Sequence, residues 1–306
     1  MKYHYEVFGL QVSCSFKLGH YPPAPSPGAP DVVLIKKKLA RPVDGLDQTV
    51  YKPYSVYNQD FYYLEISGIA RFLIQGKDTV YLEKMPGAKW NDVFAFLFDT
   101  IFTVLLMKNE IFVFHASAVA FGRKALLFCA GGGLGKSTLA ASLAANRGAR
   151  IIEDDRCLLE FNKRSGNFQV RNQFPFIELW KPQHGFASRI KGVDKGYAIR
   201  TAIAKKRFPI HAHVPARAVR LDKIVLVNMN QMEDKIEYDQ ITGIEKVRVV
   251  KNYTHLDHML KPLGKSTAHF KHISQVVQGV EVHRVRKSRS TKLPKFIKFI
   301  EDEIIA

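Results

Sequence analysis

The residues best suited to chemistry form a glycine-rich segment at residues 130–138, which reads AGGGLGKST. It fits the Walker A pattern of phosphate-binding loops with one departure, because Ala130 stands where the first glycine is usual. Glycines let backbone N–H groups turn inward around phosphate oxygens, a lysine can reach the β- and γ-phosphates, and a serine hydroxyl can ligate Mg²⁺. The segment therefore predicts binding of ATP with Mg²⁺ by Gly131, Gly132, Gly133, Leu134, Gly135, Lys136, Ser137 and Thr138.

An acidic tripeptide, Glu153-Asp154-Asp155, closes the apolar run that follows this segment. In a phosphate-binding α/β fold the carboxyl ends of neighbouring strands lie beside the bound triphosphate. One carboxylate there can hold Mg²⁺, and a second can accept the proton of an attacking hydroxyl. The spacing predicts both functions for this tripeptide and does not say which residue has which.

His115 lies in another apolar run, at residues 111–120. A turn at residues 121–124 leads from it into the run 125–130, so the two runs are expected to form a hairpin. The hairpin places His115 near the glycine-rich segment, where its ring could hydrogen-bond to a carboxylate and tune it. A histidine packed in the core is the alternative, and the residues alone leave both open.

The elements around these residues predict an α/β fold. A strand at 125–130, the glycine-rich segment, a helix at 137–147 that ends at Gly148, and a strand at 150–155 follow in the order that a P-loop core requires. Before them, short aromatic and β-branched runs predict a small β-meander, and an apolar helix is expected at 92–107. We expect an N-terminal β-rich region with this helix over residues 1–108, and a P-loop kinase domain over residues 109–306.

Two stretches need separate comment. A second Gly-Lys-Ser-Thr occurs at residues 264–267. The position of its first glycine is occupied by Met259, and no apolar strand leads into it, so we expect no phosphate site there. The stretch 181–220 has no clear periodicity and is expected to be loop-rich.

Composition excludes several classes of protein. The chain has 306 residues, 46% of them hydrophobic and 24% charged, which is ordinary for a globular protein. Its three cysteines are widely spaced, which argues against a disulfide framework or a zinc site and suits a reducing cytosol. The first residues lack the apolar core of a signal peptide. The apolar run 93–107 is shorter than the roughly 20 residues that span a bilayer, so we expect a cytoplasmic protein without a membrane segment.

The net charge of +18 is concentrated in the C-terminal part of the chain. Residues 181–306 carry 25 basic and 12 acidic side chains. Such a surface attracts an acidic peptide, a nucleic acid or an anionic lipid. A surface that only keeps the protein soluble is the alternative.

The segments HASAVAFGRKALLFCAGGGLGKST at 115–138 and IIEDDR at 151–156 resemble the HPr kinase/phosphorylase family and the HPr-kinase-like serine kinases. The resemblance lies in the order of parts: a strand with a histidine, a hairpin, a P-loop, a helix, then Asp-Asp-Arg. It implies a kinase core of the HPr kinase/PEP carboxykinase type.

The resemblance also implies roles for single residues. Asp154 would be the general base, supported by His115, and Lys136 would act on the phosphates. Ser137 and Asp155 would serve Mg²⁺. Glu178, in the run FIELW at 176–180, would make a second metal contact.

The chain departs from the family at Trp180-Lys181-Pro182, which stands where the family has a glycine-rich signature after the glutamate. That signature bears on phosphorolysis and on docking of the HPr protein, so HPr is not the expected acceptor. Relatives of this kind phosphorylate a serine of ribosomal peptide precursors, including lasso-peptide precursors. We therefore expect transfer of the ATP γ-phosphoryl group to a serine-type hydroxyl of a peptide or protein, and a homo-oligomer is one option because HPr kinases form oligomers.

Two other functions stay open. A small-molecule kinase, acting on a free amino acid or a sugar, would use the same loop with a closed acceptor pocket. A nucleic-acid-binding ATPase is suggested by the charge and by the segment 207–220. No zinc finger, helix-turn-helix or RNA-binding signature supports a nucleic-acid partner.

Overall fold

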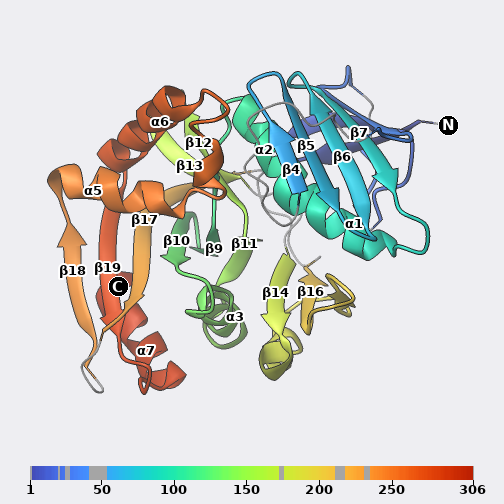
Figure 1. The fold of residues 1–306 in the computed structure, drawn as a ribbon. Helices are drawn as coiled ribbons and strands as arrows, with labels where there is room; N and C mark the ends of the chain where they lie inside the picture. Colours follow the sequence, from blue (N-terminus) through green and yellow to red (C-terminus); the bar gives the residue numbers. More distant parts are fainter. Residues whose placement is uncertain are drawn as a thin grey trace. The chain divides into compact units, whose positions relative to one another are not determined.

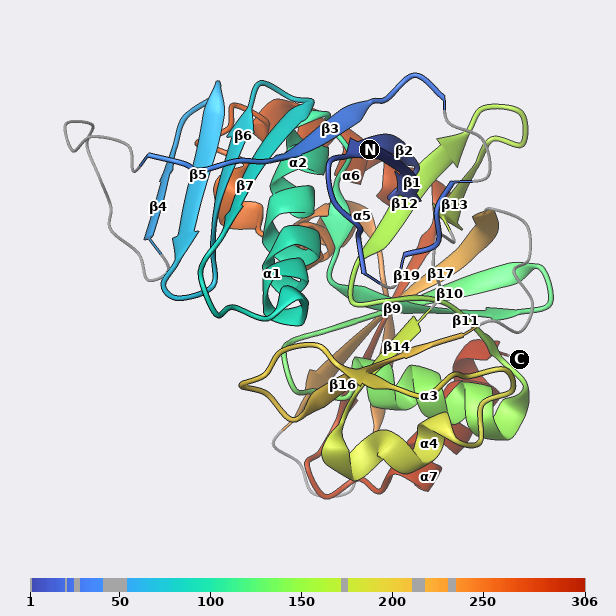
Figure 2. The same cartoon turned by 90° about the vertical axis from the view of Figure 1, so that its right-hand side faces the viewer.

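The computed structural model describes residues 2–19, 21–24, 28–40, 54–171, 176–210, 218–230 and 235–305. The fold is mixed α/β with three sheets (Figure 1, Figure 2). The chain divides into two compact units. The first contains residues 1–112, 198–203 and 258–269, and the second contains residues 113–197, 204–257 and 270–306. The basic segment 207–220 lies partly outside the described residues.

The first unit is built on a seven-stranded sheet with the order β1-β2-β3-β7-β6-β5-β4. Strands β3, β6 and β7 alternate buried and more exposed positions, as expected for strands with one covered face. Strands β5 to β7 form an antiparallel meander, as predicted, and β4 extends it by pairing with β5. The run that forms β3 was expected in the same meander but pairs in parallel with β7. The bounds are β1 (Tyr3–Val7), β2 (Leu10–Cys14), β3 (Val32–Lys36), β4 (Tyr54–Tyr57), β5 (Phe61–Ile66), β6 (Ala70–Gln75) and β7 (Thr79–Lys84).

The predicted apolar helix is present as α1 (Trp90–Phe96), a π-helical turn η1 (Leu97–Ile101) and α2 (Phe102–Lys108). By length and composition alone, the 19 residues Trp90–Lys108 could cross a membrane, but 61% of the apolar stretch is buried inside the fold. All seven residues of α2 are buried. The helix thus forms the core of the first unit, with Phe102 against Phe8 of the sheet region.

The second unit is built on a nine-stranded sheet with the order β11-β9-β10-β17-β13-β12-β8, in which β19 also pairs with β17 and β18 pairs with β19. Strand β10 is parallel to β17, and β17 is parallel to β19. Strand β9 is antiparallel to both β10 and β11. The carboxyl ends of β10, β11, β17 and β19 therefore lie at one end of the sheet. The bounds are β8 (Val113–Phe114), β9 (Ala116–Phe121), β10 (Lys124–Ala130), β11 (Arg150–Asp154), β12 (Cys157–Asn162), β13 (Asn167–Arg171), β17 (Ala218–Met229), β18 (Glu237–Ile241) and β19 (Glu281–Lys287).

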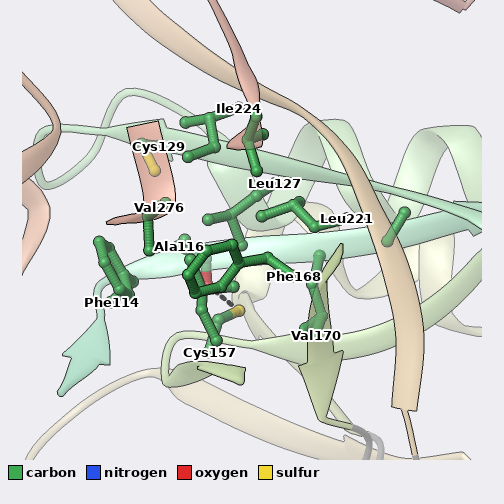
Figure 3. Packing of buried hydrophobic residues seen from close by; sticks show 14 of the residues in the cluster. Phe114, Ala116, Leu127, Cys129, Cys157, Phe168, Val170, Leu221, Ile224 and Val276 are labelled. Carbon is green, nitrogen blue, oxygen red and sulfur yellow. Dashed lines mark hydrogen bonds between the residues drawn. The ribbon is translucent and has the colours of Figure 1, made fainter. Parts of the chain in front are cut away.

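Helices cover both faces of this sheet, because β10 is apolar on both. Leu127 belongs to a core with α5 (Gly243–Val250) and α6 (Ser266–Gly279). Phe128 belongs to the opposite core with α3 (Lys136–Arg147) and α7 (Leu293–Ile300). Figure 3 shows the first of these cores, in which the Cys157 thiol donates to the carbonyl of Ala116 at 3.3 Å.

The predicted hairpin, the helix after the glycine-rich segment and the following strand are all present, and α3 ends at Gly148 in the left-handed conformation. One expectation was wrong. The run 111–120 is not one strand, because β8 pairs with β12 while β9 pairs with β10, and His115 lies at the break between them. The described residues of the stretch 181–220, expected to be loop-rich, also contain a helical segment, η2 (Lys181–Gln183) with α4 (His184–Ala187), and two strands of a third sheet. That sheet has the order β14-β16-β15, with β14 (Phe176–Trp180), β15 (Tyr197–Ala198) and β16 (Lys205–Pro209).

Candidate functional site

One end of the second unit's sheet gathers the residues that the sequence singled out. Strand β10 ends at Ala130 and runs into the glycine loop, residues 131–135, while β11 ends at Asp154. Strand β9 lies between them and begins directly after His115, with Ala116 opposite Cys129 and Ser117 opposite Asp154. Strand pairing therefore brings His115, the loop and the acidic pair to one place.

The glycine loop is open on its inner side. Gly133 and Gly135 have φ angles of 76° and 90°, which L side chains rarely adopt. A Cβ at Gly132, Gly133 or Gly135 would meet no atom within 4 Å. Among the described residues, the amides of these three glycines find no hydrogen-bond acceptor. Together with the N-terminus of α3, they leave donors available for an anion such as a phosphate.

Lys136 follows the loop, and its ammonium group is largely buried. Its Nζ donates to the carbonyl of Ala130 at 2.9 Å and lies 3.0 Å from Nε2 of His115. Burial lowers the pKa of Lys136, while the charges of Asp155 and Asp154 oppose this effect. Because an ammonium group only donates, Nε2 of His115 is assigned as the acceptor, which leaves the proton of a neutral ring on Nδ1.

Asp154 is fully buried, and both of its carboxylate oxygens are occupied by donors from the protein. Oδ1 accepts from the hydroxyl of Ser117 at 2.5 Å and from that of Ser137 at 3.0 Å. Oδ2 accepts from the backbone N–H of Glu178 at 2.9 Å. Burial raises the pKa of Asp154, and its hydrogen bonds and the charge of Lys205 oppose that rise. Asp154 is therefore fixed beneath the loop and orients Ser137.

Asp155 faces a different set of groups. Its φ of 76° turns the chain sharply after β11, so its side chain does not follow that of Asp154. Oδ1 lies 3.2 Å from Nδ1 of His115, a close approach without the alignment of a good hydrogen bond, and Oδ2 lies 3.6 Å from Arg156. Burial opposes ionisation of Asp155, but His115 and the charges of Arg156 and Lys205 hold its pKa well below the usual range.

These contacts differ from the expected pairings. The resemblance implied that His115 supports Asp154 and that Asp155 and Ser137 together serve Mg²⁺, whereas His115 contacts Asp155 and Ser137 contacts Asp154. The physical reason is the left-handed backbone of Asp155, which sends two adjacent carboxylates to opposite neighbours. Aspartate tolerates this conformation better than most residues.

Glu178 does not fit the metal contact expected of it. It lies in β14, where its carboxylate accepts from Lys205 at 2.7 Å and from Arg207 Nε at 3.0 Å. Burial raises the pKa of Glu178, but the charges of Arg207 and Lys205 outweigh it and keep the pKa low. With cations on both oxygens, Glu178 holds the third sheet together. Among the described residues, no group of three or more His, Cys, Asp or Glu side chains is arranged to hold a metal ion.

The sequence reasoning missed three residues beside the acidic pair. Lys205 and Arg207 project from β16, in the stretch that showed no periodicity, and Glu178 and the two aspartates raise the pKa of the buried Lys205 despite its desolvation. Ser117 was missed because its partner, Asp154, is 37 residues away and only the pairing of β9 with β11 brings them together. A single serine in an otherwise apolar strand was the available signal.

A second histidine also lies beside the site. The rings of His255 and His115 are stacked with centroids 5.8 Å apart. The backbone N–H of His255 donates to the carbonyl of Val113 at 2.7 Å, which anchors this segment next to the break that holds His115.

Comparisons with known proteins add little. No protein-family model matches the chain, and no curated protein matches it. Among solved structures, the HPr(Ser) kinase/phosphatase from Coxiella burnetii is a structural neighbour at 11% sequence identity, over 62% of this chain and 88% of that chain. The TM-score is 0.32, too low for this likeness to support an inference about function.

Proposed function

We propose that this protein is an ATP- and Mg²⁺-dependent kinase with a P-loop core, which phosphorylates a serine-type hydroxyl of a peptide or protein. One observation carries the proposal: an open glycine loop, a buried lysine and a paired His115–Asp155 meet at one end of a sheet. Each part alone is common, but their convergence provides donors for a triphosphate and a carboxylate for the acceptor.

The glycine loop and Lys136 would bind the phosphates of ATP. The free amides of Gly132, Gly133 and Gly135 supply donors, and Lys136 would exchange its present contacts for phosphate oxygens. The hydroxyl of Ser137 would ligate a Mg²⁺ ion that is otherwise held by phosphates and water, the usual arrangement for this metal. Asp154, which accepts from this hydroxyl at 3.0 Å, would orient it. When bound, Mg²⁺ would offset the charge that develops on the phosphate oxygens.

Asp155 is the general base of the proposed reaction, in place of Asp154. The oxygens of Asp154 are occupied and its side chain is inaccessible, whereas that of Asp155 is 18% exposed and ionised at neutral pH. The acceptor oxygen forms a bond to the γ-phosphorus while the bond from that phosphorus to the β,γ-bridging oxygen breaks, which releases ADP. The hydroxyl proton passes to Asp155, which His115 holds in position.

The low pKa of Asp155 is compatible with this role. The transition state of phosphoryl transfer is loose, so the acceptor needs little help in losing its proton before the bond forms. Position and electrostatics decide the rate. The contact from Lys136 to His115 and from His115 to Asp155 joins the phosphate-binding side of the site to the acceptor side.

A peptide or protein acceptor is supported by the charge distribution, since residues 181–306 carry 25 basic and 12 acidic side chains. Such a surface would attract an acidic peptide segment. Free serine and a nucleic acid are the alternatives that the experiment must separate from it.

The experiment is mass spectrometry of acceptors after incubation with ATP and Mg²⁺. An acidic serine-containing peptide and free serine are offered together to the wild type, Asp155→Asn and Lys136→Met. We expect phosphate on the peptide serine with the wild type alone, and ATP binding retained in Asp155→Asn. Equal transfer by Asp155→Asn would contradict the assignment of the base. Transfer to free serine only would indicate a small-molecule kinase, and ATP hydrolysis stimulated by nucleic acid with a steep salt dependence would indicate the ATPase.

A further inference from the structure

Lys205 is a cation beside the acidic pair that the proposed reaction has not used. It lies on the same face of β16 as Arg207, because successive side chains of a strand alternate between its two faces. Trp180 and Glu178 of β14 are the direct partners of these two residues in the antiparallel pair. The face therefore presents one buried carboxylate to two cations.

The two cations differ in the number of their contacts. Arg207 is 8% exposed, donates through Nε to Oε1 of Glu178 at 3.0 Å, and lies 4.1 Å from the ring centroid of Phe176. Lys205 is 19% exposed, and among the described residues Glu178 is the one acid within ion-pair distance of its Nζ, at 2.7 Å. An ammonium group has three N–H donors. Glu178 thus fixes the direction of Lys205 and leaves donors for a ligand.

Strand β14 holds Lys205 next to the acidic pair. It packs against β11 and α3, and Figure 2 shows β14 and β16 beside α3. The backbone N–H of Glu178 donates to Oδ2 of Asp154 at 2.9 Å, so the residue that binds Lys205 is itself anchored on Asp154. Burial opposes ionisation of Lys205, but the charges of Glu178 and the two aspartates raise its pKa. Lys205 is therefore charged at neutral pH.

Contacts lead from the two oxygens of Asp155 to two different lysines. On the side of Oδ1, Nδ1 of His115 lies at 3.2 Å, and the other nitrogen of this ring contacts Lys136. On the side of Oδ2, Arg156 lies at 3.6 Å, and it is 3.9 Å from the carboxylate that binds Lys205. The proposed base thus has a lysine from α3 on one side and a lysine from β16 on the other.

The transferred phosphoryl group needs positive charge on the side of the acceptor. In the transition state, negative charge is spread over its three equatorial oxygens. The loop amides and Lys136 would serve the oxygens that face the glycine loop, but the acceptor enters beside the carboxylates of Asp154 and Asp155, which repel these oxygens. A fixed ammonium group on that side offsets the repulsion without having to reorient during the reaction.

We propose that Lys205 is a catalytic residue, whose ammonium group donates a hydrogen bond to an equatorial oxygen of the γ-phosphoryl group during its transfer. The proton stays on the nitrogen, and the bonds that form and break are those of the proposed reaction. Glu178 is a positioning residue, because its Oε2 holds Lys205. The proposal rests on the proposed function, which places the γ-phosphoryl group beside Asp155.

The test compares steady-state transfer to the acidic serine-containing peptide by the wild type and three variants. Lys205→Met should lower kcat by a factor on the order of 10² to 10³, as for the loss of one charge-stabilising donor. It should leave KM for ATP within about 3-fold, the pattern of a contact made only in the transition state. Lys205→Arg keeps the charge and should be at least about 10-fold faster than Lys205→Met. Lys206→Met is the matched control, because Lys206 is exposed on the other face of β16, opposite Leu179, and should change neither constant.

A double variant separates catalysis from support of the fold. If Lys205 only neutralises Glu178, then Lys205→Met combined with Glu178→Gln removes both charges and should recover the wild-type kcat, which would overturn the proposal. We expect the double variant to stay as slow as Lys205→Met. The double variant and Lys205→Arg also answer the question where Lys205→Met alone unfolds.

A readout without an acceptor distinguishes failure of this proposal from failure of the proposed function. The probe is ADP with aluminium fluoride and Mg²⁺, which imitates a phosphoryl group in transfer, titrated by calorimetry beside ATP. Lys205→Met should bind the imitation at least about 10-fold more weakly than the wild type does, because a group that stabilises the transition state binds its analogue, and should bind ATP as before. If the wild type binds neither ATP nor the imitation, both ideas fail. If the wild type binds both and transfers phosphate, and Lys205→Met equals it in kcat and in affinity for the imitation, only the role of Lys205 is wrong.

Discussion

The same four residues, Gly-Lys-Ser-Thr, occur twice in this chain with different surroundings. In both copies the glycine is left-handed, with φ of 90° at Gly135 and 67° at Gly264. In both copies the chain then enters a helix, α3 in the first and α6 in the second. The first is preceded by β10, whereas the second follows a short 3₁₀ turn, η4 (Asp257–Met259). No strand leads into the second segment, as the sequence predicted.

The lysines of the two segments, Lys136 and Lys265, have different surroundings. Lys136 is buried between the carbonyl of Ala130 and His115, close to two carboxylates. Lys265 forms an ion pair at 3.1 Å with Glu110, whose side chain is 58% exposed. A Cβ at Gly264 would lie 3.2 Å from the Gln59 amide, whereas the glycine loop has free space. The proposed phosphate site thus differs from the second segment in the strand that leads into the tetrapeptide and in the acidic strand beside it, and not in the four residues themselves.

The largest predicted effect is on the rate of phosphoryl transfer, and it distinguishes Lys136 from Lys265. Lys136→Met should lower the rate of phosphoryl transfer by a factor on the order of 10³, because it removes a charge that stabilises the transition state. Lys265→Met is the matched control and should leave the rate unchanged. Steady-state transfer assays on both variants are the measurement, and equal losses would mean that the two segments do not differ as described.

Substitutions of Gly135 and Gly264 should differ in their effect on ATP binding but should lower the free energy of unfolding by similar amounts. Gly135→Ala and Gly264→Ala each force an alanine into the left-handed region, at a cost of about 1–2 kcal/mol in free energy of unfolding. Only Gly135→Ala should also lose ATP binding, because the loop must keep its shape around the phosphates. Urea unfolding and ATP titration of both variants would check this, and ATP binding by Gly135→Ala at wild-type affinity would contradict it.

A substitution at Ser117 tests whether Asp154, at the end of β11, is needed for the function of the first Gly-Lys-Ser-Thr segment. Ser117→Ala removes one donor from Asp154 Oδ1 and should loosen the carboxylate that orients Ser137. We expect Mg²⁺-dependent activity to fall roughly 10-fold, as for other residues that orient metal-binding groups. A Mg²⁺ titration of the rate should show a higher Mg²⁺ requirement. An unchanged titration would mean that Ser137 is oriented by other contacts.

The smallest predicted effect is on the pH dependence of stability, and it comes from the buried carboxyl group of Glu153. Burial raises the pKa of Glu153 well above its usual range, so the folded protein holds a proton there that the unfolded chain releases above about pH 4.3. Stability should therefore decline as pH rises from that value through the folded pKa. Glu153→Gln should flatten the decline in urea unfolding between pH 5 and pH 8.

The matched control for Glu153 is Glu110, the exposed acid of the second segment. Glu110→Gln should change the free energy of unfolding by less than about 1 kcal/mol, as expected for a surface ion pair, and should leave its pH dependence as in the wild type. If Glu153→Gln shows the same decline as the wild type, the proton is not on Glu153.

Local patterns account for the parts that the sequence predicted. The apolar runs around the glycine loop, the helix stop at Gly148 and the meander of the first unit depend on neighbouring residues, and the structure confirms them. Non-local geometry accounts for the rest. The positive φ of Asp155 directs its side chain to His115 and leaves Asp154 with Ser137, the reverse of the expected contacts. The cations that contact Glu178 come from β16, a strand whose sequence showed no periodicity.

The most direct test of the account is hydrogen exchange of the full chain, followed by mass spectrometry, with and without ATP and Mg²⁺. The two Gly-Lys-Ser-Thr segments serve as target and internal control in one experiment. ATP bound in the glycine loop should slow exchange in peptides that cover residues 130–138, where Gly132, Gly133 and Gly135 have free amides, and should leave exchange in peptides that cover residues 261–268 unchanged. Unchanged exchange at 130–138 under saturating ATP, or equal protection of both segments, would contradict it.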